Sequence, residues 1–188
     1  MSIPSTRVAA LAAAGALALV LSACAPEADP SPAPTPTASG APIFASDEEA
    51  LAAAVEAYEV YLAVVDELTQ TGGENSERIR AFAESAYAAE LEESLAQLRL
   101  SGKRTSGDSS VDGIELIEYE DRSGGAAVSV YACLDVSEVR VLDADGVDVT
   151  PSDRIERRPL QLEFVSALDD PERLLPAGSE PWPGDDFC

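Results

Sequence analysis

The sequence predicts an α+β domain that follows an N-terminal targeting segment and a linker. Two observations carry this expectation. Apolar residues recur at helical spacing up to Leu100, and from Ser101 onward the period changes towards two, as in strands. Hydrophobic residues make up 46% of the chain, which suits a globular domain. Helices followed by hairpin-joined strands favour an antiparallel sheet with one face packed against the helices.

The helical half shows start and stop signals. Ser46 lies three residues before Glu49, which is the capping-box arrangement for a helix start. Leu51, Val55 and Tyr58 begin an apolar stripe at spacings of three and four, and the Gly72-Gly73 pair ends it. Ser76 is expected to cap a short second helix. The three expected helices are Asp47 to about Thr71, Ser76 to Phe82, and about Ser85 to Leu100.

The second half alternates as strands do. Ser123-Gly124-Gly125 is typical of a hairpin turn between two apolar runs, and Asp145-Gly146 and Asp169-Asp170-Pro171 indicate further turns. Additional strands are expected at Glu138 to Leu142, at Pro159 to Leu168 and around Arg173 to Pro176.

Charge and composition exclude several functions. The chain has 35 acidic and 12 basic residues, a net charge of −23 and no histidine. Histidine triads and His-Cys zinc sites are therefore excluded, and a phosphate-binding surface would oppose the protein's own field, so no nucleic-acid partner is expected. No cofactor and no metal are expected. The acidic string from Asp143 to Asp148 offers oxygen ligands for calcium but lacks EF-hand spacing, so a solvated turn is favoured.

The N-terminus indicates export. An uncharged, mostly apolar run from Val8 to Ala23 follows Arg7 and is too short to cross a bilayer as a helix. The run ends in Leu21-Ser22-Ala23-Cys24, which resembles the lipobox of bacterial lipoproteins. The resemblance implies a signal peptide over 1–23, lipidation of Cys24 by acyl chains such as palmitate, and attachment to the extracytoplasmic face of the cell membrane. The alternative is an ordinary signal peptide that leaves Cys24 as a thiol.

Two further segments follow the lipidated cysteine. A disordered linker over 24–45 is expected, because prolines recur at alternate positions between Pro30 and Pro36 and the segment cannot form a core. The folded domain is expected over 46–188. If Cys24 carries lipid, Cys133 and Cys188 remain as a pair in an oxidising compartment, where a disulfide is expected; two free thiols are the alternative.

The strand Val130-Tyr131-Ala132-Cys133-Leu134-Asp135-Val136-Ser137 and the ending Glu180-Pro181-Trp182 to Phe187-Cys188 are similar to those of a group of actinobacterial lipoproteins of the nuclear transport factor 2-like (cystatin-like) superfamily. This resemblance implies a cystatin-like cone, in which three N-terminal helices pack in a curved antiparallel sheet. The superfamily includes isomerases, dehydratases, transport factors and accessory domains, so the resemblance does not decide the function.

The expected function is a non-catalytic binding or interaction domain, held at the cell envelope by its lipid, whose partner is an envelope protein or a small ligand. The alternative is a small-molecule carrier or an isomerase- or dehydratase-like enzyme that uses the cone pocket. Its candidate residues are Tyr58, Tyr61, Tyr131 and Asp135, although packing roles are favoured for these side chains. Trp182 is expected to cover the end of the core rather than stack on a ligand. A homodimer through the outer face of the sheet is a further alternative.

Overall fold

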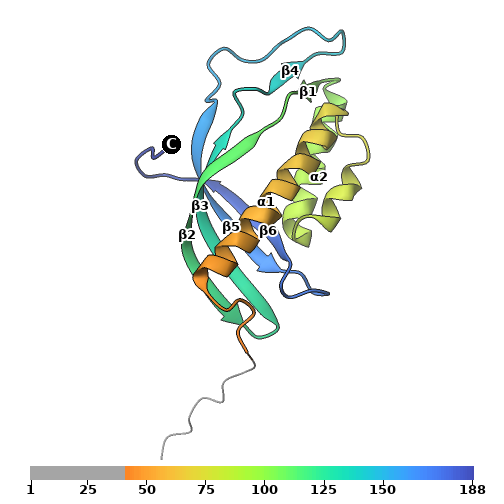
Figure 1. The fold of residues 1–188 in the computed structure, drawn as a ribbon. Helices are drawn as coiled ribbons and strands as arrows, with labels where there is room; N and C mark the ends of the chain where they lie inside the picture. Colours follow the sequence, from red (N-terminus) through yellow and green to blue (C-terminus); the bar gives the residue numbers. More distant parts are fainter. Residues whose placement is uncertain (1–40) are drawn as a thin grey trace, which may run out of the picture. The chain divides into compact units, whose positions relative to one another are not determined.

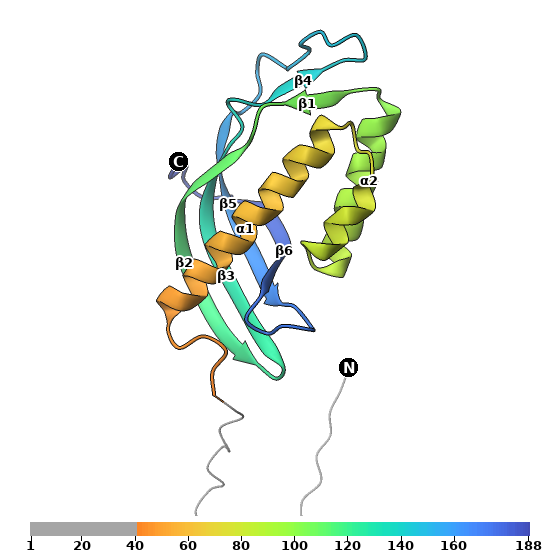
Figure 2. The ribbon, with the colours of Figure 1, turned by 45° about the vertical axis from the view of Figure 1, so that its right-hand side comes forward.

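The computed structural model of the protein describes residues 41–188, so the expected signal peptide, Cys24 and most of the expected linker lie outside the described residues. The helices are α1 (Asp47–Gln70), the 3-10 helix η1 (Ser76–Ala81) and α2 (Ser85–Leu100). The strands are β1 (Arg104–Ser106), β2 (Ser110–Arg122), β3 (Gly125–Asp135), β4 (Arg140–Leu142), β5 (Arg157–Ser166) and β6 (Leu174–Pro181). The two α-helices lie on one side of the larger sheet, and the C-terminal end of the chain lies on the other (Figures 1 and 2).

Helix α1 begins where the capping box predicts. The Ser46 hydroxyl accepts a hydrogen bond from the Glu49 backbone N–H at 3.2 Å, and the Glu49 carboxylate accepts one from the Ala45 N–H at 2.7 Å. These bonds satisfy backbone donors that a helix start leaves without partners. Helix α1 ends before Gly72 and Gly73, which have φ values of 68° and 82°. The expected long first helix and the expected third helix are confirmed.

The strands form two antiparallel sheets. The larger sheet has the order β2-β3-β5-β6, and the smaller one pairs β1 with β4. Along β3, Val128, Val130 and Ala132 are buried towards the helices, whereas Tyr131 between them is half-buried on the opposite face. This alternation is that of a strand with one face in the core. Leu160, Leu162 and Phe164 of β5 extend the same core, so aliphatic and aromatic side chains fill the space between α1 and the sheet.

The expected fold of three helices in one curved antiparallel sheet, the cystatin-like cone, is wrong. Within residues 41–188 there are two α-helices, one short 3-10 helix and two separate sheets. The middle helix is not capped by Ser76; instead Asn75 enters it with φ 55° and makes no side-chain cap. This segment buries only Ile79, so it has too little apolar surface to support a longer helix.

The sheet is divided because one long hairpin is interrupted. Ser106 pairs with Arg140 in the smaller sheet, and Ser110 pairs with Asp135 in the larger one, so both sheets contain parts of the same two antiparallel stretches. Between them Gly107 adopts φ 83°, and its α-carbon lies so close to the Glu138 carbonyl that a β-carbon would not fit. The positive φ of Gly107 takes the backbone out of the extended conformation, and the pairing stops at Ser106 and resumes at Ser110 in the larger sheet.

The start of the described chain is fixed to the sheet. The Phe44 N–H donates to the Tyr119 hydroxyl at 3.0 Å, and the Ile43 N–H donates to the Asp121 carboxylate at 3.0 Å. The Phe44 ring is buried and packs edge-on against Tyr119 at 5.6 Å. The chain therefore enters the domain beside the β2–β3 turn, at the end opposite β1 and β4 (Figure 1). No helix within residues 41–188 is long and apolar enough to span a membrane.

Candidate functional site

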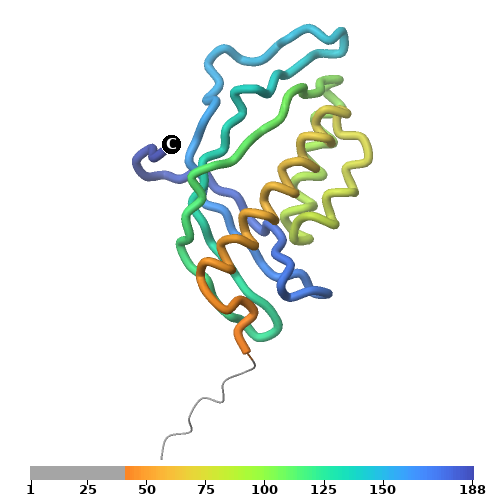
Figure 3. Tube along the Cα trace, viewed as in Figure 1, coloured from red at the N-terminus to blue at the C-terminus, as the bar shows by residue number. Residues whose placement is uncertain are grey.

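The C-terminal tail, residues 182–188, lies against the face of the larger sheet that the helices do not cover. After β6 the chain turns back, and the Trp182 N–H donates to the Pro159 carbonyl of β5 at 3.0 Å. Cys188 is bonded to Cys133 of β3, with the two α-carbons 5.6 Å apart, which confirms the expected disulfide. The path of the tail is visible in Figure 3. This bond and this hydrogen bond attach both ends of the tail to the sheet.

Three aromatic side chains gather between the tail and the sheet. Tyr131 of β3 packs edge-to-face against Trp182, with ring centroids 4.8 Å apart and planes at 71°. It meets Phe187 in the same way at 5.7 Å and 62°. Phe187 remains 46% exposed, so the group is open to solvent on one side. We call Tyr131, Trp182 and Phe187 the aromatic triad.

Beside the aromatic triad lies a solvent-open cavity of about 400 Å³, here called the aromatic pocket. Its volume lies in the range of small-molecule sites. On the β2 side a bulge between Asp112 and Glu115 interrupts the pairing with β3. At this bulge Gly113 has φ 60°, and a β-carbon there would lie 3.5 Å from the Cys133 sulfur. The lining residues are Asp112, Gly113, Glu115, Tyr131, Cys133, Arg157, Trp182 and Phe187.

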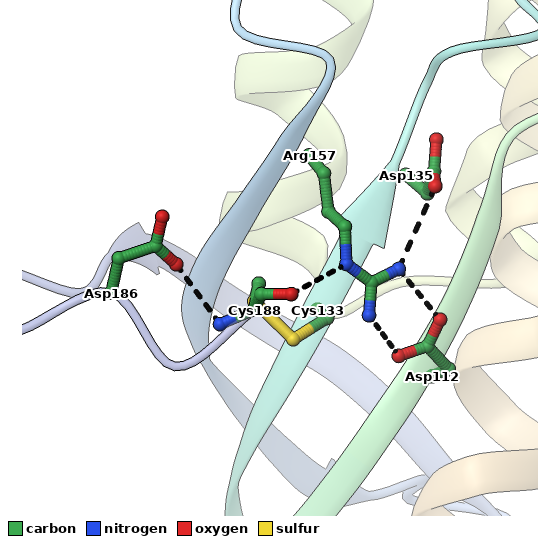
Figure 4. The surroundings of a disulfide bond; sticks show 6 residues. All are labelled: Asp112, Cys133, Asp135, Arg157, Asp186 and Cys188. Atoms are coloured by element: carbon green, nitrogen blue, oxygen red, sulfur yellow. Dashed lines mark hydrogen bonds and ion pairs between the residues drawn. A yellow bond between two sulfur atoms is a disulfide. The ribbon is translucent and has the colours of Figure 1, made fainter.

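One guanidinium organises the polar end of the aromatic pocket (Figure 4). Arg157 donates from both terminal nitrogens to the Asp112 carboxylate, one bond measuring 2.7 Å, and from Nε to the Cys188 backbone oxygen at 3.1 Å. Asp135 lies 3.6 Å from the same guanidinium. The hydrogen bonds to Asp112 raise the pKa of Arg157, and they lower the pKa of Asp112. Both groups are therefore held in their charged forms near neutral pH.

The four side chains predicted for a pocket are not brought together. Tyr131 and Asp135 lie on the tail side of the sheet, whereas Tyr58 and Tyr61 of α1 are only 3% and 5% exposed on the helix side. Tyr61 donates to the Tyr87 hydroxyl at 3.3 Å, and burial raises the pKa of both Tyr58 and Tyr61. These two tyrosines are packing residues of the core.

Asp135 is engaged in a local turn. Its carboxylate accepts a hydrogen bond from the Ser137 N–H at 2.8 Å. The hydrogen bonds from Ser137 lower the pKa of Asp135, which keeps it ionised at neutral pH. An acid that exchanges protons at neutral pH needs a raised pKa, so Asp135 is unsuited to general acid–base catalysis.

The sequence predicted that Trp182 covers the end of the core, and this prediction is wrong. Trp182 lies on the tail side of the sheet against Tyr131 and lines the aromatic pocket. The flanking prolines and the neighbouring cysteine indicate a fixed segment, but they do not report which face of the sheet that segment crosses.

The buried carboxylate Asp66 was missed by sequence reasoning. It is 9% exposed, and it accepts hydrogen bonds from the Ser109 N–H at 2.8 Å and the Ser109 hydroxyl at 2.9 Å. Burial raises the pKa of Asp66, partly offset by the bonds from Ser109. The signal was present, because Tyr58, Leu62 and Asp66 follow each other at four-residue spacing on one helix face.

Asp66 lines a cleft of about 480 Å³, but its hydrogen bonds indicate a structural role. Both of its oxygens accept from Ser109, in the segment where the long hairpin is interrupted. Next to it, Thr69 accepts a hydrogen bond from Thr105 at 2.8 Å, and the Gln70 amide donates to the Gly107 carbonyl at 3.0 Å. These bonds attach the end of α1 to the interrupted hairpin.

The acidic string is used in a turn. The Asp143 carboxylate accepts from the backbone N–H groups of Asp145 at 3.0 Å and Val147 at 2.9 Å. This Asx-type arrangement gives the Asp143 carboxylate a role in holding the turn. In the described part of the chain no cluster of three or more Cys, Asp or Glu side chains is arranged to hold a metal ion.

No family model matches this chain, and no curated protein matches it either. The resemblance to the nuclear transport factor 2-like superfamily therefore stays a prediction from the sequence, and the site must be interpreted from its own chemistry.

Proposed function

We propose that the protein is a lipid-anchored, extracytoplasmic binding module of the cell envelope, and that it holds a small ligand in the aromatic pocket without transforming it. The observation that carries this proposal is the aromatic triad, which lines an open cavity and is fixed there by a disulfide. Large rigid rings beside a few placed polar groups are the usual composition of ligand sites.

The anchoring part of the proposal rests on Cys24 and on the entry point of the chain. The lipobox-like sequence ends at Cys24, and the described chain enters the domain beside the β2–β3 turn, where Phe44 is fixed to Tyr119. The Cys133–Cys188 disulfide supports an oxidising compartment, since such bonds persist outside the cytosol.

Binding without catalysis is supported by the protonation states in the pocket. The pKa of Asp112 is lowered and that of Arg157 is raised, because the two groups are hydrogen-bonded to each other and carry opposite charges. Neither group exchanges protons near neutral pH, and the chain has no histidine to do so. The helix side of the sheet, where the alternative function would need a cone pocket, is filled by Val130, Leu162 and Phe164.

The charge on the tail side of the sheet favours a monomer over the homodimer considered from the sequence. Glu115, Glu118 and Glu120 of β2 are all exposed, and the aromatic pocket opens on the same side. Two copies meeting there would bring like charges together. Size-exclusion chromatography coupled to light scattering of the detergent-extracted protein tests this, and a dimer mass would contradict it.

The anchor is tested by metabolic labelling with a palmitate analogue. The wild-type protein is expected to carry label and to sediment with membranes, whereas Cys24→Ala is expected to lose both properties. Labelling that persists in Cys24→Ala would refute the anchor.

Ligand binding in the aromatic pocket is tested with a fragment library and with fluorescence, because Trp182 is the single tryptophan of the chain. Fragments are expected to change the emission of the wild type but not of Phe187→Ala. Leu168→Ala, which truncates a fully exposed side chain between β5 and β6 and outside the pocket lining, is the matched control and should respond like the wild type. A library with no fragment that discriminates between these variants would overturn the proposal.

A further inference from the structure

The aromatic pocket has an uneven charge distribution. Among its lining residues within 41–188, Arg157 is the one base, and it stands against the acids Asp112 and Glu115. The Arg157 guanidinium is already hydrogen-bonded to protein groups: both terminal nitrogens donate to Asp112, and Nε donates to the Cys188 oxygen. An anionic ligand would have to displace these bonds, so the pocket is poorly suited to a carboxylate or a phosphate.

Glu115 supplies a negative charge that has no matching base at the rim. The salt bridges in the described chain pair Arg157 with Asp112 and Asp135 and leave Glu115 out. Glu118 and Glu120 continue the negative charge along β2, and only the last of these pairs with a base, Arg122. The field at the mouth of the pocket therefore attracts cations.

The rings of the aromatic triad suit the same class of ligand. The Tyr131 ring stands at 71° to Trp182 and at 62° to Phe187, so the three rings do not lie in one plane. Aromatic faces carry the negative part of the ring quadrupole, and methylated ammonium groups are recognised by several aromatic rings that surround one site.

We propose that the aromatic pocket binds a small organic cation with a methylated ammonium group, placed against the aromatic triad with its charge facing Glu115. This inference rests on the proposed function and narrows it to one class of ligand. The cavity of about 400 Å³ accepts a molecule of the size of choline. The bulge at Gly113 keeps a side chain from filling the space beside Cys133.

The test uses the full-length protein with its disulfide intact and follows Trp182 fluorescence. Choline is titrated against 3,3-dimethylbutanol, its neutral carbon isostere, and sodium chloride at matched concentration controls for ionic strength. Choline is expected to bind at least about fivefold more tightly than the isostere, which is the scale of a cation–π contribution. Phosphatidylcholine vesicles that compete with choline would assign the source of the group to a lipid headgroup, and vesicles that do not compete would assign it to a free molecule.

Two variants of the same strand test the role of charge. Glu115→Gln is expected to weaken choline binding about twofold to fivefold, as for a solvent-exposed charge pair, and to leave the isostere unaffected. Glu118→Gln is the matched control, because it removes one charge from β2 outside the pocket lining. Tyr131→Leu is expected to weaken choline much more than the isostere.

The outcomes separate the two proposals. Equal affinity for choline and its isostere, or equal losses in Glu115→Gln and Glu118→Gln, would overturn the cation inference while leaving a pocket that binds ligands. No response of Trp182 to choline, together with no response to any library fragment, would overturn the inference and the proposed function together.

Discussion

Arg157 of β5 reaches across β3 to bind Asp112 of β2 through both terminal nitrogens of its guanidinium. Strands β5 and β2 are not neighbours in the sheet, so this contact joins elements that the backbone ladder does not. Because Nε of the same guanidinium binds the Cys188 oxygen, one side chain holds both the edge strand β2 and the C-terminal tail in position. The geometry of the aromatic pocket therefore depends on an ion pair as well as on the disulfide.

The Asp112–Arg157 pair predicts a pH dependence of stability. The folded-state pKa of Asp112 lies below its ordinary value, so its contribution to stability is present above the unfolded pKa, about 3.9, and is lost as the pH falls through the folded pKa. Denaturant unfolding of wild type and Asp112→Asn is measured from pH 7 to pH 2. The wild type is expected to be the more stable protein at pH 7, and the difference is expected to shrink only below about pH 4. A difference that is constant down to pH 2 would contradict the assigned pKa.

Asp66 predicts a pH dependence of stability that is opposite in sign to that of Asp112. Burial raises its folded-state pKa, so its favourable contribution is present below the unfolded pKa and is lost as the pH rises through the folded pKa. Asn at this position keeps an oxygen for the Ser109 N–H without a charge. Denaturant unfolding is therefore expected to show that the unfolding free energy of Asp66→Asn increases relative to that of the wild type as the pH rises from 3 to 7.

Two further variants check this account of Asp66. Asp66→Ala leaves the Ser109 N–H without its acceptor and is expected to lose about 1–3 kcal/mol of unfolding free energy. Glu59→Gln, which neutralises an exposed acid of the same cleft that does not contribute to the raised pKa of Asp66, should show no such pH-dependent gain. A gain in Glu59→Gln equal to that in Asp66→Asn would attribute the effect to general charge and not to burial.

The disulfide is expected to stabilise both the fold and the pocket. Cys133 and Cys188 are 55 residues apart, and closing a loop of this length contributes about 4 kcal/mol in the chain-entropy model. Cys188→Ser is expected to lose most of this free energy in denaturant unfolding. The Trp182 emission is also expected to shift to longer wavelength, because the released tail exposes the indole.

Mass spectrometry supplies the control for the disulfide. The intact mass under denaturing, non-reducing conditions should be smaller than the reduced mass by two hydrogens. Equal masses would show that the disulfide is absent, and they would contradict the account of how the tail is attached to the sheet.

Sequence patterns predicted those features that depend on residues close together in the chain. Ser46 and Glu49 determine the start of α1 by local hydrogen bonds, and the cysteine count left Cys133 and Cys188 as the available pair. The division into two sheets was missed, because apolar alternation reports that a stretch is a strand but not where its pairing is interrupted. Gly107 causes that interruption through a close approach to Glu138, and such a contact is set by the tertiary fold.

The candidate site was predicted in part for the same reason. Tyr131 was among the candidates and does line the aromatic pocket, but Tyr58 and Tyr61 were grouped with it although the sheet lies between them. Period-two alternation places neighbouring residues on opposite faces without showing which face the tail will cover. The tail is placed by the disulfide and by Arg157, and the second of these contacts leaves no signal in the sequence.

The interruption of the hairpin can be tested at Gly107. Its φ of 83° disfavours any residue with a β-carbon, at roughly 1–2 kcal/mol, and the Glu138 carbonyl occupies the space that this atom would need. Gly124 in the β2–β3 turn has a φ of 92° with open space around it, so Gly124→Ala measures the backbone term alone. Gly107→Ala is expected to lose clearly more unfolding free energy than Gly124→Ala, since it adds a steric clash between the two halves of the hairpin. Equal losses would mean that the approach to Glu138 is not tight, and the division into two sheets would then need another cause.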